Sequence, residues 1–284
     1  MFKRLQRSDY EMILAMIIFG TLAPFVRNVA TSSATIAFSR TLLGAIVLQI
    51  MLLFKRQTHS LAKGERKLMV LSAAALAGNW IFLFESYRYV SVSIATMLYY
   101  TAPILALLLS FIFFHEPLTK RQIGCFILTL IGCILISWQP QSAFNLRGVI
   151  MGLCAAFCYA MILLLQRFRK PMPGLLLTSW QLSIAAILLG IYLVISKDTT
   201  MLHISLAQLP WLLCIGIVHT ALAYYLYFHA LAHLALARSA LYSYLDPLTA
   251  ILLSFLIWQE SCTGMQGSGI VLLFSAMLLY SYQK

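Results

Sequence analysis

Two stretches decide the fold: FESYRYVSVSIATMLYYTAPILALLLSFIFFHEPLTKRQ at residues 84–122 and FHALAHLALARSALYSYLDPLTAILLSFLIWQESCTGMQ at residues 228–266. They align without a gap at an offset of 144 residues, which is 247 − 103. The aligned positions share a Leu-Leu-Ser-Phe run, and they also pair Tyr100 with Tyr244, Pro103 with Pro247, Glu116 with Glu260, Thr119 with Thr263 and Gln122 with Gln266. Apolar helices match Leu on Leu by chance, but not Pro, Glu, Thr and Gln in one register. The chain is therefore an internal duplication.

The composition excludes most protein classes. Of the 284 residues, 62% are hydrophobic and 10% are charged, whereas a soluble domain is roughly 45–50% apolar and about 25% charged. The same values exclude a disordered chain, which needs low hydrophobicity. The net charge of +12 comes from short basic clusters between apolar runs, not from one basic face, so we expect no nucleic-acid partner. The composition predicts a protein embedded in the lipid bilayer.

Apolar runs of membrane-spanning length recur along the whole chain. A helix needs about 20 residues to cross a hydrocarbon layer of about 30 Å. Runs of that scale lie at about residues 11–27, 35–54, 68–87, 92–114, 122–138, 148–166, 175–195, 208–228, 237–258 and 267–282. The connections are too short to hold a soluble domain. We expect an all-α integral membrane protein with ten transmembrane helices.

The distribution of basic residues predicts the orientation. With the N-terminus in the cytoplasm, 15 of the 20 Lys and Arg residues lie in cytoplasmic segments, four lie outside and Arg40 lies within a span. A shift by one span would invert this ratio. The positive-inside rule therefore predicts a multi-pass protein of the cell inner (plasma) membrane with both termini cytoplasmic, and residues 1–10 as a cytoplasmic N-terminus. The first apolar run has no signal-peptide cleavage site, so we interpret it as a retained span.

The duplication divides the chain into two five-helix repeats, at residues 11–138 and 147–282. Because five is odd, the second repeat enters the membrane upside down relative to the first. Inverted repeats are the usual architecture of secondary transporters, whose substrate site lies near the midplane between the halves. The alternative is that the duplication only builds a stable bundle.

The repeated segments and two N-terminal motifs resemble a known family. The stretches at residues 79–119 and 221–263, with FGTLAPFVRN at 19–28 and FSRTLLGA at 38–45, are similar to the drug/metabolite transporter superfamily, EamA type. The resemblance implies a ten-helix inner-membrane carrier that works by alternating access, often an exporter of amino acids, other metabolites or cationic drugs. The second repeat departs from the pattern at Ser261-Cys262, where the first has Pro117-Leu118, so we expect a looser outer hairpin.

Asp246 is the strongest candidate for a functional side chain. It lies in the middle of a span directly before Pro247, and an ionisable group there is a candidate functional residue by default. Ser239, Tyr242 and Asp246 have the spacing of one helical face. Asp246 either binds a substrate amine or a coupling proton, or it stabilises a helix break through hydrogen bonds. The residues leave both interpretations open.

Arg40 and Glu85 are two further ionisable residues within spans. They can pair with each other across the bundle, or Glu85 can pair with Arg88 one turn along. An Arg–Glu pair within a bundle usually has a structural role. The alternative is that Arg40 binds the carboxylate of a substrate. His219 also lies within a span, where a histidine is more often an interhelical hydrogen bond than a proton relay.

Aromatic residues at matched depths predict a cavity. Thr96, Tyr99 and Pro103 share a face whose inverted counterpart is the Tyr242 face, with Trp80, Tyr100 and Tyr244 nearby. Two such faces meeting would form an apolar cavity with hydroxyl groups, suited to a flat or organic solute that carries an amine. Pro103 and Pro247 are hinge candidates, because each interrupts a helix at matching depth.

We therefore expect a secondary-active exporter of a small organic metabolite such as an amino acid or related amine. The alternatives are a cationic drug or multidrug efflux carrier, and a membrane scaffold without transport. The scattered acidic residues argue against an enzyme, and we expect neither a cofactor nor a metal. A coupling proton is a candidate second ligand, and glycines in the fifth and tenth spans leave a homodimer open.

Overall fold

The structure is a computed structural model that describes residues 6–56, 63–115, 119–137, 145–168, 172–231, 233–234, 242, 245–259 and 263–281. The predicted residues Ser239, Tyr244, Glu116 and Glu260, and the Ser261-Cys262 hairpin, lie outside this part. The described residues form helices and no strand. This is an all-α membrane protein, as predicted.

The first repeat contains α1 (Arg7–Gly20), α2 (Leu22–Arg27), α3 (Ser33–Phe54), α4 (Lys63–Tyr89), α5 (Val92–Tyr99), α6 (Ala102–Phe114) and α7 (Lys120–Ser137). The second contains α8 (Leu146–Arg167), α9 (Gly174–Ile195), the short η1 (Thr200–His203), α10 (Leu209–Gly216), η2 (Ile217–Leu222), α11 (Ala223–Leu231), α13 (Leu245–Trp258) and α14 (Gly264–Ser281). Consecutive short helices join into single spans, because α1 and α2, α5 and α6, and α10 to α11 follow one another with at most two residues between them.

Seven of the predicted spans are confirmed as helices long and apolar enough to cross a membrane: Arg7–Arg27, Ser33–Phe54, Glu65–Tyr89, Ile94–Phe114, Leu146–Leu165, Gly174–Ile195 and Leu209–Leu231. In the ninth and tenth spans, the described residues form shorter apolar helices. The first helix begins at Arg7, earlier than predicted, because Gln6 and Asp9 form a reciprocal capping box.

Exposed apolar side chains cover the outside of the bundle. Leu53, Val194 and Leu256 are 69%, 78% and 75% exposed. Such exposure would be unfavourable in water. It is the expected surface of a protein whose solvent is hydrocarbon.

Helix contacts repeat when the two halves are exchanged. The first span packs against the eighth (α1 on α11), and the sixth packs against the third (α8 on α4). Likewise α13 packs on α1 and α6 packs on α8, while α3 packs on α9, and α7 on α14. The described helices of the two halves therefore pack against one another in a similar pattern.

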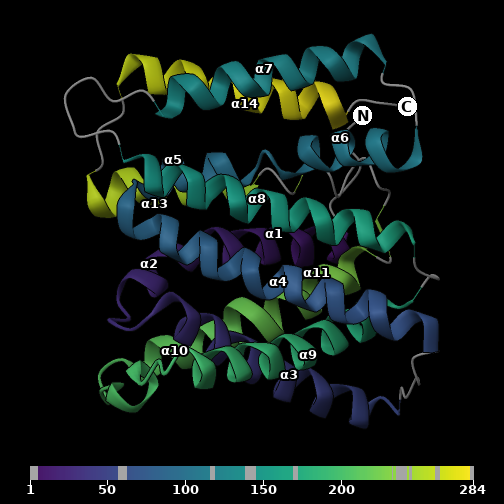
Figure 1. Ribbon diagram of the computed structural model, residues 1–284, viewed down its shortest axis with the longest axis vertical. Helices are drawn as coiled ribbons and strands as arrows, with labels where there is room; N and C mark the ends of the chain where they lie inside the picture. The colour runs from purple at the N-terminus through teal and green to yellow at the C-terminus, as the bar shows by residue number, and fades with distance from the viewer. Residues whose placement is uncertain are drawn as a thin grey trace.

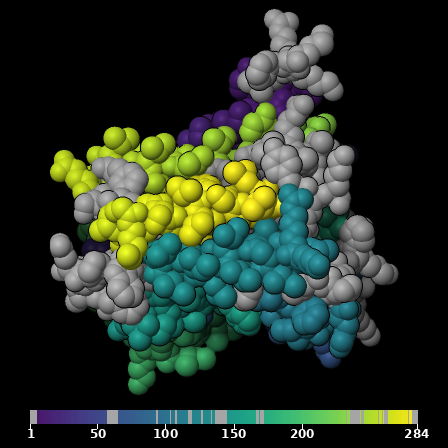
Figure 2. All heavy atoms as spheres, turned by 90° about the horizontal axis from the view of Figure 1, so that it is seen from above, coloured from purple at the N-terminus to yellow at the C-terminus, as the bar shows by residue number. Residues whose placement is uncertain are grey.

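The α7–α14 pair forms an outer layer of the molecule (Figure 1). Figure 2 shows α7 in teal and α14 in yellow, side by side across that face. Gly132 makes this approach possible, because a Cβ at this position would lie 2.9 Å from Leu273 Cγ and 3.0 Å from the Gly269 carbonyl oxygen. Gly124, on the same helix, has open space at the equivalent point.

We predict that Gly132→Ala destabilises the protein relative to Gly124→Ala. Both changes add the same methyl group to α7, but only the first forces α14 to move, at a cost of about 1–3 kcal/mol. Thermal unfolding of the two variants in detergent measures the difference. Equal melting temperatures would show that α7 and α14 do not pack closely at Gly132.

Candidate functional site

Arg40 lies in the eighth position of α3 and is only 3% exposed. Its Nε donates to Thr220 Oγ1 at 2.9 Å, and Nη2 donates to the His219 carbonyl oxygen at 3.3 Å. The guanidinium carbon lies 4.0 Å from the centroid of the Trp80 ring, a cation–π contact. Among the described residues, no carboxylate forms an ion pair with Arg40. Its charge is stabilised by neutral dipoles and an aromatic face.

The two residues that accept hydrogen bonds from Arg40 lie in η2, a π-helical turn within the eighth span. A π turn widens the helix by one residue, and such turns occur frequently at functional sites. Thr220 Oγ1 also donates to the Ile215 carbonyl oxygen at 2.8 Å, five residues earlier. The turn therefore orients both a hydroxyl and a backbone carbonyl towards α3.

Asp246 lies in the first turn of α13, and its carboxylate accepts a hydrogen bond from the Tyr100 hydroxyl. Tyr100 itself follows α5, at the break between α5 and α6. The bond thus joins the interrupted fourth span to the start of α13.

The first span packs directly behind Asp246. A Cβ at Gly20 would lie 2.5 Å from the Asp246 carbonyl oxygen and 2.6 Å from Thr249 Cβ. Only glycine therefore allows α1 to approach α13 this closely. This contact fixes the backbone that carries the carboxylate.

Tyrosines surround both charges. The Tyr99 ring stacks on Tyr159 with centroids 5.3 Å apart, and it meets Tyr100 edge-on at 5.6 Å. Arg40 is within electrostatic range of Asp246 and of the hydroxyls of Tyr99 and Tyr224. We call these residues, from six spans, the central polar cluster: Arg40, Trp80, Tyr99, Tyr100, Tyr159, Tyr224 and Asp246.

Five of the predicted site residues thus meet in the central polar cluster: Arg40, Trp80, Tyr99, Tyr100 and Asp246. His219 adjoins it through its backbone carbonyl. Its ring is 2% exposed and contacts Thr21 Oγ1 at 3.0 Å and the Cys214 carbonyl oxygen at 3.2 Å. This is an interhelical hydrogen-bonding role, the more common one for a histidine in a span.

Arg40 and Glu85 do not pair, which corrects one of the two predicted arrangements. Glu85 lies near the end of α4, and its ion pairs are with Arg88 and Arg147, each at 3.8 Å. Ser33 Oγ also donates to Glu85 at 2.8 Å. The alternative pairing of Glu85 with Arg88 is confirmed.

Tyr242 does not join Asp246, despite the shared helical face that its spacing predicts. Its hydroxyl donates to Asp9 Oδ1 at 3.0 Å, and its ring packs with the Met12 and Met16 cluster of α1. Asp246 instead faces Tyr100. Tyr242 and Asp246 are one helical turn apart in sequence, but they contact different neighbouring helices. The predicted contact between the Tyr99 face and the Tyr242 face is therefore not observed.

The break in the fourth span lies at Tyr100 and Thr101, slightly before Pro103. Thr101 Oγ1 donates to the Leu98 carbonyl oxygen at 2.7 Å, and Pro103 occupies the first turn of α6. Proline is well tolerated there because the first turn needs no N–H donor. Pro247 holds the matching place in the first turn of α13.

Three cluster contacts were missed by the sequence analysis: Tyr159, Tyr224 and Thr220. Tyr224 was detectable, because it is the repeat equivalent of Trp80 at the 144-residue offset (80 + 144). Tyr159 lies outside the gapless part of the repeat. Thr220 is significant only because η2 turns it towards Arg40.

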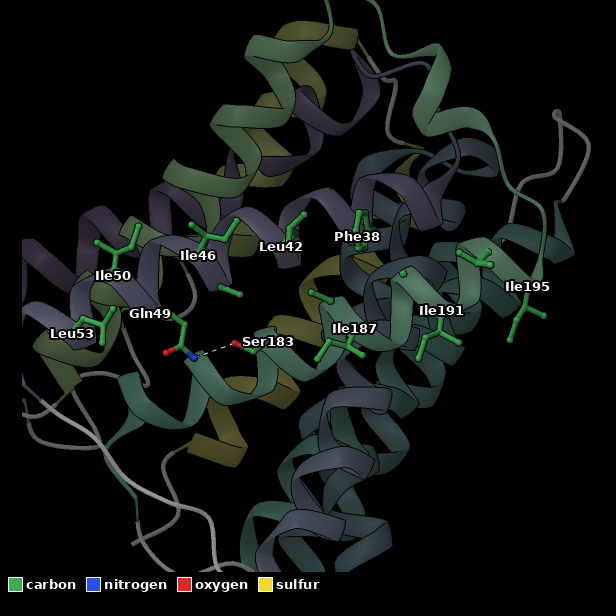
Figure 3. Close-up of a pocket in the computed structure, with 14 residues that line it drawn as sticks. Phe38, Leu42, Ile46, Gln49, Ile50, Leu53, Ser183, Ile187, Ile191 and Ile195 are labelled. Atoms are coloured by element: carbon green, nitrogen blue, oxygen red, sulfur yellow. Dashed lines mark hydrogen bonds between the residues drawn. The ribbon is translucent and has the colours of Figure 1, made fainter.

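A separate groove of about 760 Å³ lies between α3 and α9 (Figure 3). It is lined by apolar side chains except for Gln49 and Ser183, which hydrogen-bond to each other at 3.1 Å. Its walls include the outward-facing Ile46, Ile187 and Ile191. The groove contains no residue of the central polar cluster and suits hydrocarbon chains, not a charged solute.

Metal coordination has no basis in the described part of the chain. No three His, Cys, Asp or Glu side chains gather there in a way that could hold an ion. The chemistry available in the central polar cluster is the binding of charged and aromatic groups.

Comparisons with known proteins agree on one family. The model of the EamA-like transporter family matches twice, at residues 8–138 and 146–282. The uncharacterized transporter YxxF of Bacillus subtilis (strain 168) is 28% identical over 95% of this chain and 88% of its own. Protein PecM of Dickeya dadantii (strain 3937) is 26% identical over 75% of this chain and 72% of its own.

A solved structure shares the fold. This crystal structure matches the present one with a TM-score of 0.64, and the two sequences are 16% identical. The match covers 96% of each chain. At that identity the similarity supports the architecture alone.

We predict that Tyr100→Phe and Asp246→Asn are energetically coupled. Each change weakens the same hydrogen bond, so the double variant loses less stability than the sum, by about 1.5–3 kcal/mol for a bond to a charged group. A double-mutant cycle by thermal unfolding in detergent tests this. Tyr192→Phe is the matched control, because Tyr192 is 50% exposed on α9. It should combine additively with Asp246→Asn, and additivity in the Tyr100 cycle would contradict the assigned bond.

Proposed function

Because this chain belongs to the EamA-like transporter family, it is a membrane transporter, and we propose that it carries a small amino acid or related amine. The observation that supports this substrate class is the central polar cluster. There, a buried cation and a partly buried anion lie within electrostatic range of each other without forming an ion pair.

The two charges are complementary to a zwitterion. Among the described residues, Arg40 contacts only neutral groups, and the Asp246 carboxylate accepts a hydrogen bond from the Tyr100 hydroxyl. Charged hydrogen bonds are roughly twice as strong as neutral ones, and arginine matches the two oxygens of a carboxylate. A bound amino acid would supply the missing countercharges, its carboxylate to Arg40 and its ammonium to Asp246.

The aromatic residues favour an organic side chain. The stacked Tyr99 and Tyr159 rings and the Trp80 ring present apolar faces beside polar hydroxyls and the charges. Such pockets bury the apolar part of a ligand, while a few polar groups fix its orientation. The cluster thus supports a metabolite with a flat or apolar portion over a small inorganic ion.

Transport would occur by alternating access between the repeats 11–138 and 147–282, the second inverted relative to the first. The breaks before Pro103 and Pro247 are the hinges in this proposal, because interrupted helices can bend there at low cost. The Tyr100–Asp246 bond joins the two interrupted regions. Substrate binding to Asp246 would compete with that bond and so couple occupancy to hinge movement.

The proposed location is the inner membrane with both termini cytoplasmic, as the Lys and Arg distribution favours. Export is the proposed direction, on the family resemblance alone. A proton on Asp246 is the proposed substitute for the substrate ammonium during the return step.

The second candidate function is efflux of a cationic drug. Asp246 among tyrosines favours it, since a carboxylate and aromatic faces bind lipophilic amines. The two candidates differ at Arg40. Arg40 would repel a cationic drug that has no carboxylate, whereas it would bind the carboxylate of an amino acid.

We predict that purified protein in liposomes exchanges a pooled set of amino acids in counterflow, and that Asp246→Asn reduces the exchange at least tenfold. Loss of a charged hydrogen bond to the substrate, about 1.5–3 kcal/mol, has that effect. Arg40→Gln should reduce exchange of amino acids but not of amines that lack a carboxylate.

Asp198→Asn is the control for this experiment. Asp198 lies in the loop after α9 and accepts hydrogen bonds from the backbone N–H and the hydroxyl of Thr200, which is not a residue of the cluster. The control should exchange like wild type. Undiminished exchange by Asp246→Asn would return that residue to a structural role, and absence of exchange with amino acids would favour the drug alternative.

A further inference from the structure

Among the described residues, the ion pairs outside the central polar cluster form two groups, at opposite ends of the bundle. At one end, His229 Nδ1 of α11 is 2.6 Å from Glu11 Oε2 of α1, and Glu11 also binds Arg7 at 2.8 Å. Beside this pair, the Tyr242 hydroxyl donates to the fully buried Asp9. The Glu11–His229 pair joins the start of the first span to the end of the eighth.

At the other end, Glu85 of α4 pairs with Arg147 of α8 at 3.8 Å. The neighbouring Ser86 Oγ donates to the Gly148 carbonyl oxygen at 2.8 Å. These contacts join the end of the third span to the start of the sixth. The topology makes this the opposite face from His229, because α4 and α11 end on different sides of an antiparallel bundle.

The two pairs occupy equivalent places in the two repeats. Glu85 and His229 are related by the 144-residue offset (85 + 144), and Glu11 and Arg147 each lie near the start of the first helix of their repeat. In both cases the first span of one repeat is joined to the third span of the other. The acidic and basic residues have exchanged places. In one pair the acid is on the third span and the base on the sixth, whereas in the other the base is on the eighth span and the acid on the first.

The two pairs lie at opposite ends of the proposed transport path between the repeats. Behind the His229 pair, Met12, Ala15, Met16 and Ala230 form a tightly buried cluster between α1 and α11. Ala95 is also fully buried, and it lies in α5, which packs on both α4 and α8. Alternating access requires these two helix pairs to separate in turn, so each ion pair must break once per cycle.

We propose that Glu11–His229 and Glu85–Arg147 are the inner and outer gates, and that a proton bound at His229 holds the inner gate closed. This inference rests on the proposed transport function and its orientation. The outer pair uses arginine, which is charged at every physiological pH, whereas histidine changes charge between about pH 5 and 8. The inner gate alone therefore responds to cytoplasmic pH.

The groups around His229 are consistent with this asymmetry. From α1 it faces Glu11, and Arg7 is bound to the same carboxylate, while Asp9 of the same helix accepts from Tyr242. From α11 it stacks on Tyr225, and it accepts a bond from His233 Nδ1 at its carbonyl oxygen. The ammonium group of Lys55, the residue after α3, lies 4.8 Å from the centroid of the Tyr225 ring.

Deprotonation of His229 therefore removes the positive partner nearest to Glu11. Arg7 is its other partner, but the Arg7 side chain is 87% exposed and lies on α1 itself, so it cannot join α1 to α11. The inner gate loses its interhelical ion pair as the cytoplasm becomes alkaline. Low pH holds the gate closed, and high pH favours opening and loading from the cytoplasm.

Labelling of single cysteines tests the gates without any solute. In a background with all six native cysteines replaced, Ala230→Cys reports the inner gate and Ala95→Cys the outer one. Labelling by a soluble maleimide is measured from pH 6 to 8 in detergent and divided by the rate at Tyr10→Cys, which is 60% exposed. This ratio corrects for the shared pH dependence of thiol reactivity, and the same ratio in the His229→Gln background corrects for the effect of burial on the thiol at position 230.

The expected result is a rise of about fivefold in the normalised Ala230→Cys rate from pH 6 to 8, with no change at Ala95→Cys. His229→Gln and Glu11→Gln should give the high rate at both pH values, and His229→Arg the low rate at both. Glu85→Gln should raise labelling at Ala95→Cys only. Size-exclusion chromatography of each variant confirms that it is folded.

A pH response that persists in His229→Gln would overturn the proposal, as would a flat response in wild type. Because the labelling needs no substrate, it stands apart from the proposed function. If the protein exchanges amino acids but labelling does not depend on pH, the proposed function stands and the proposed gate is wrong. If labelling depends on pH through His229 but no amino acid is exchanged, the gate stands and the proposed substrate class is wrong.

Discussion

The charge of Arg40 must be stabilised inside a helix that crosses the hydrocarbon layer, and much of the core is arranged around that requirement. A cation there costs several kcal/mol unless the protein replaces its water. The replacement consists of a hydroxyl and a carbonyl from η2 and the face of Trp80. Three features are needed to stabilise the buried charge of Arg40. They are the π turn, the close packing of α3 against η2 and the buried Trp80 indole. A Cβ at Gly44, for example, would lie 2.5 Å from Thr220 Cγ2.

The duplication gives a symmetric framework that carries asymmetric chemistry. Equivalent helices make equivalent contacts in both halves, but Arg40 stands in the first half and Asp246 in the second. The equivalents Trp80 and Tyr224 also differ, since the first covers the guanidinium and the second contacts Phe19 at 5.2 Å. A site between such halves can distinguish the two ends of a zwitterion. An exact repeat would instead present the same charges to both ends.

The sequence was a good guide to the fold because the bilayer imposes strong rules. Span length and the Pro, Glu, Thr and Gln register of the repeat are local patterns, and the structure confirms the helices they predict. The site was harder to predict. Helical spacing showed that Tyr242 and Asp246 share a face, but it could not show that Asp9 on one neighbour and Tyr100 on another would separate them. Tyr159 and Thr220 gain their meaning only from packing, which no single segment encodes.

The most direct test of the central claim is a binding measurement on the purified wild-type protein. Each ligand series would contain an amino acid, the amine that lacks its carboxylate and the acid that lacks its ammonium, built on leucine and on phenylalanine, with thermal stabilisation as the readout. If Arg40 and Asp246 together bind a zwitterion, the amino acid of at least one series stabilises the protein more than both of its analogues combined. If the amine alone stabilises it as much as the amino acid in every series, Arg40 binds no carboxylate and the account is wrong.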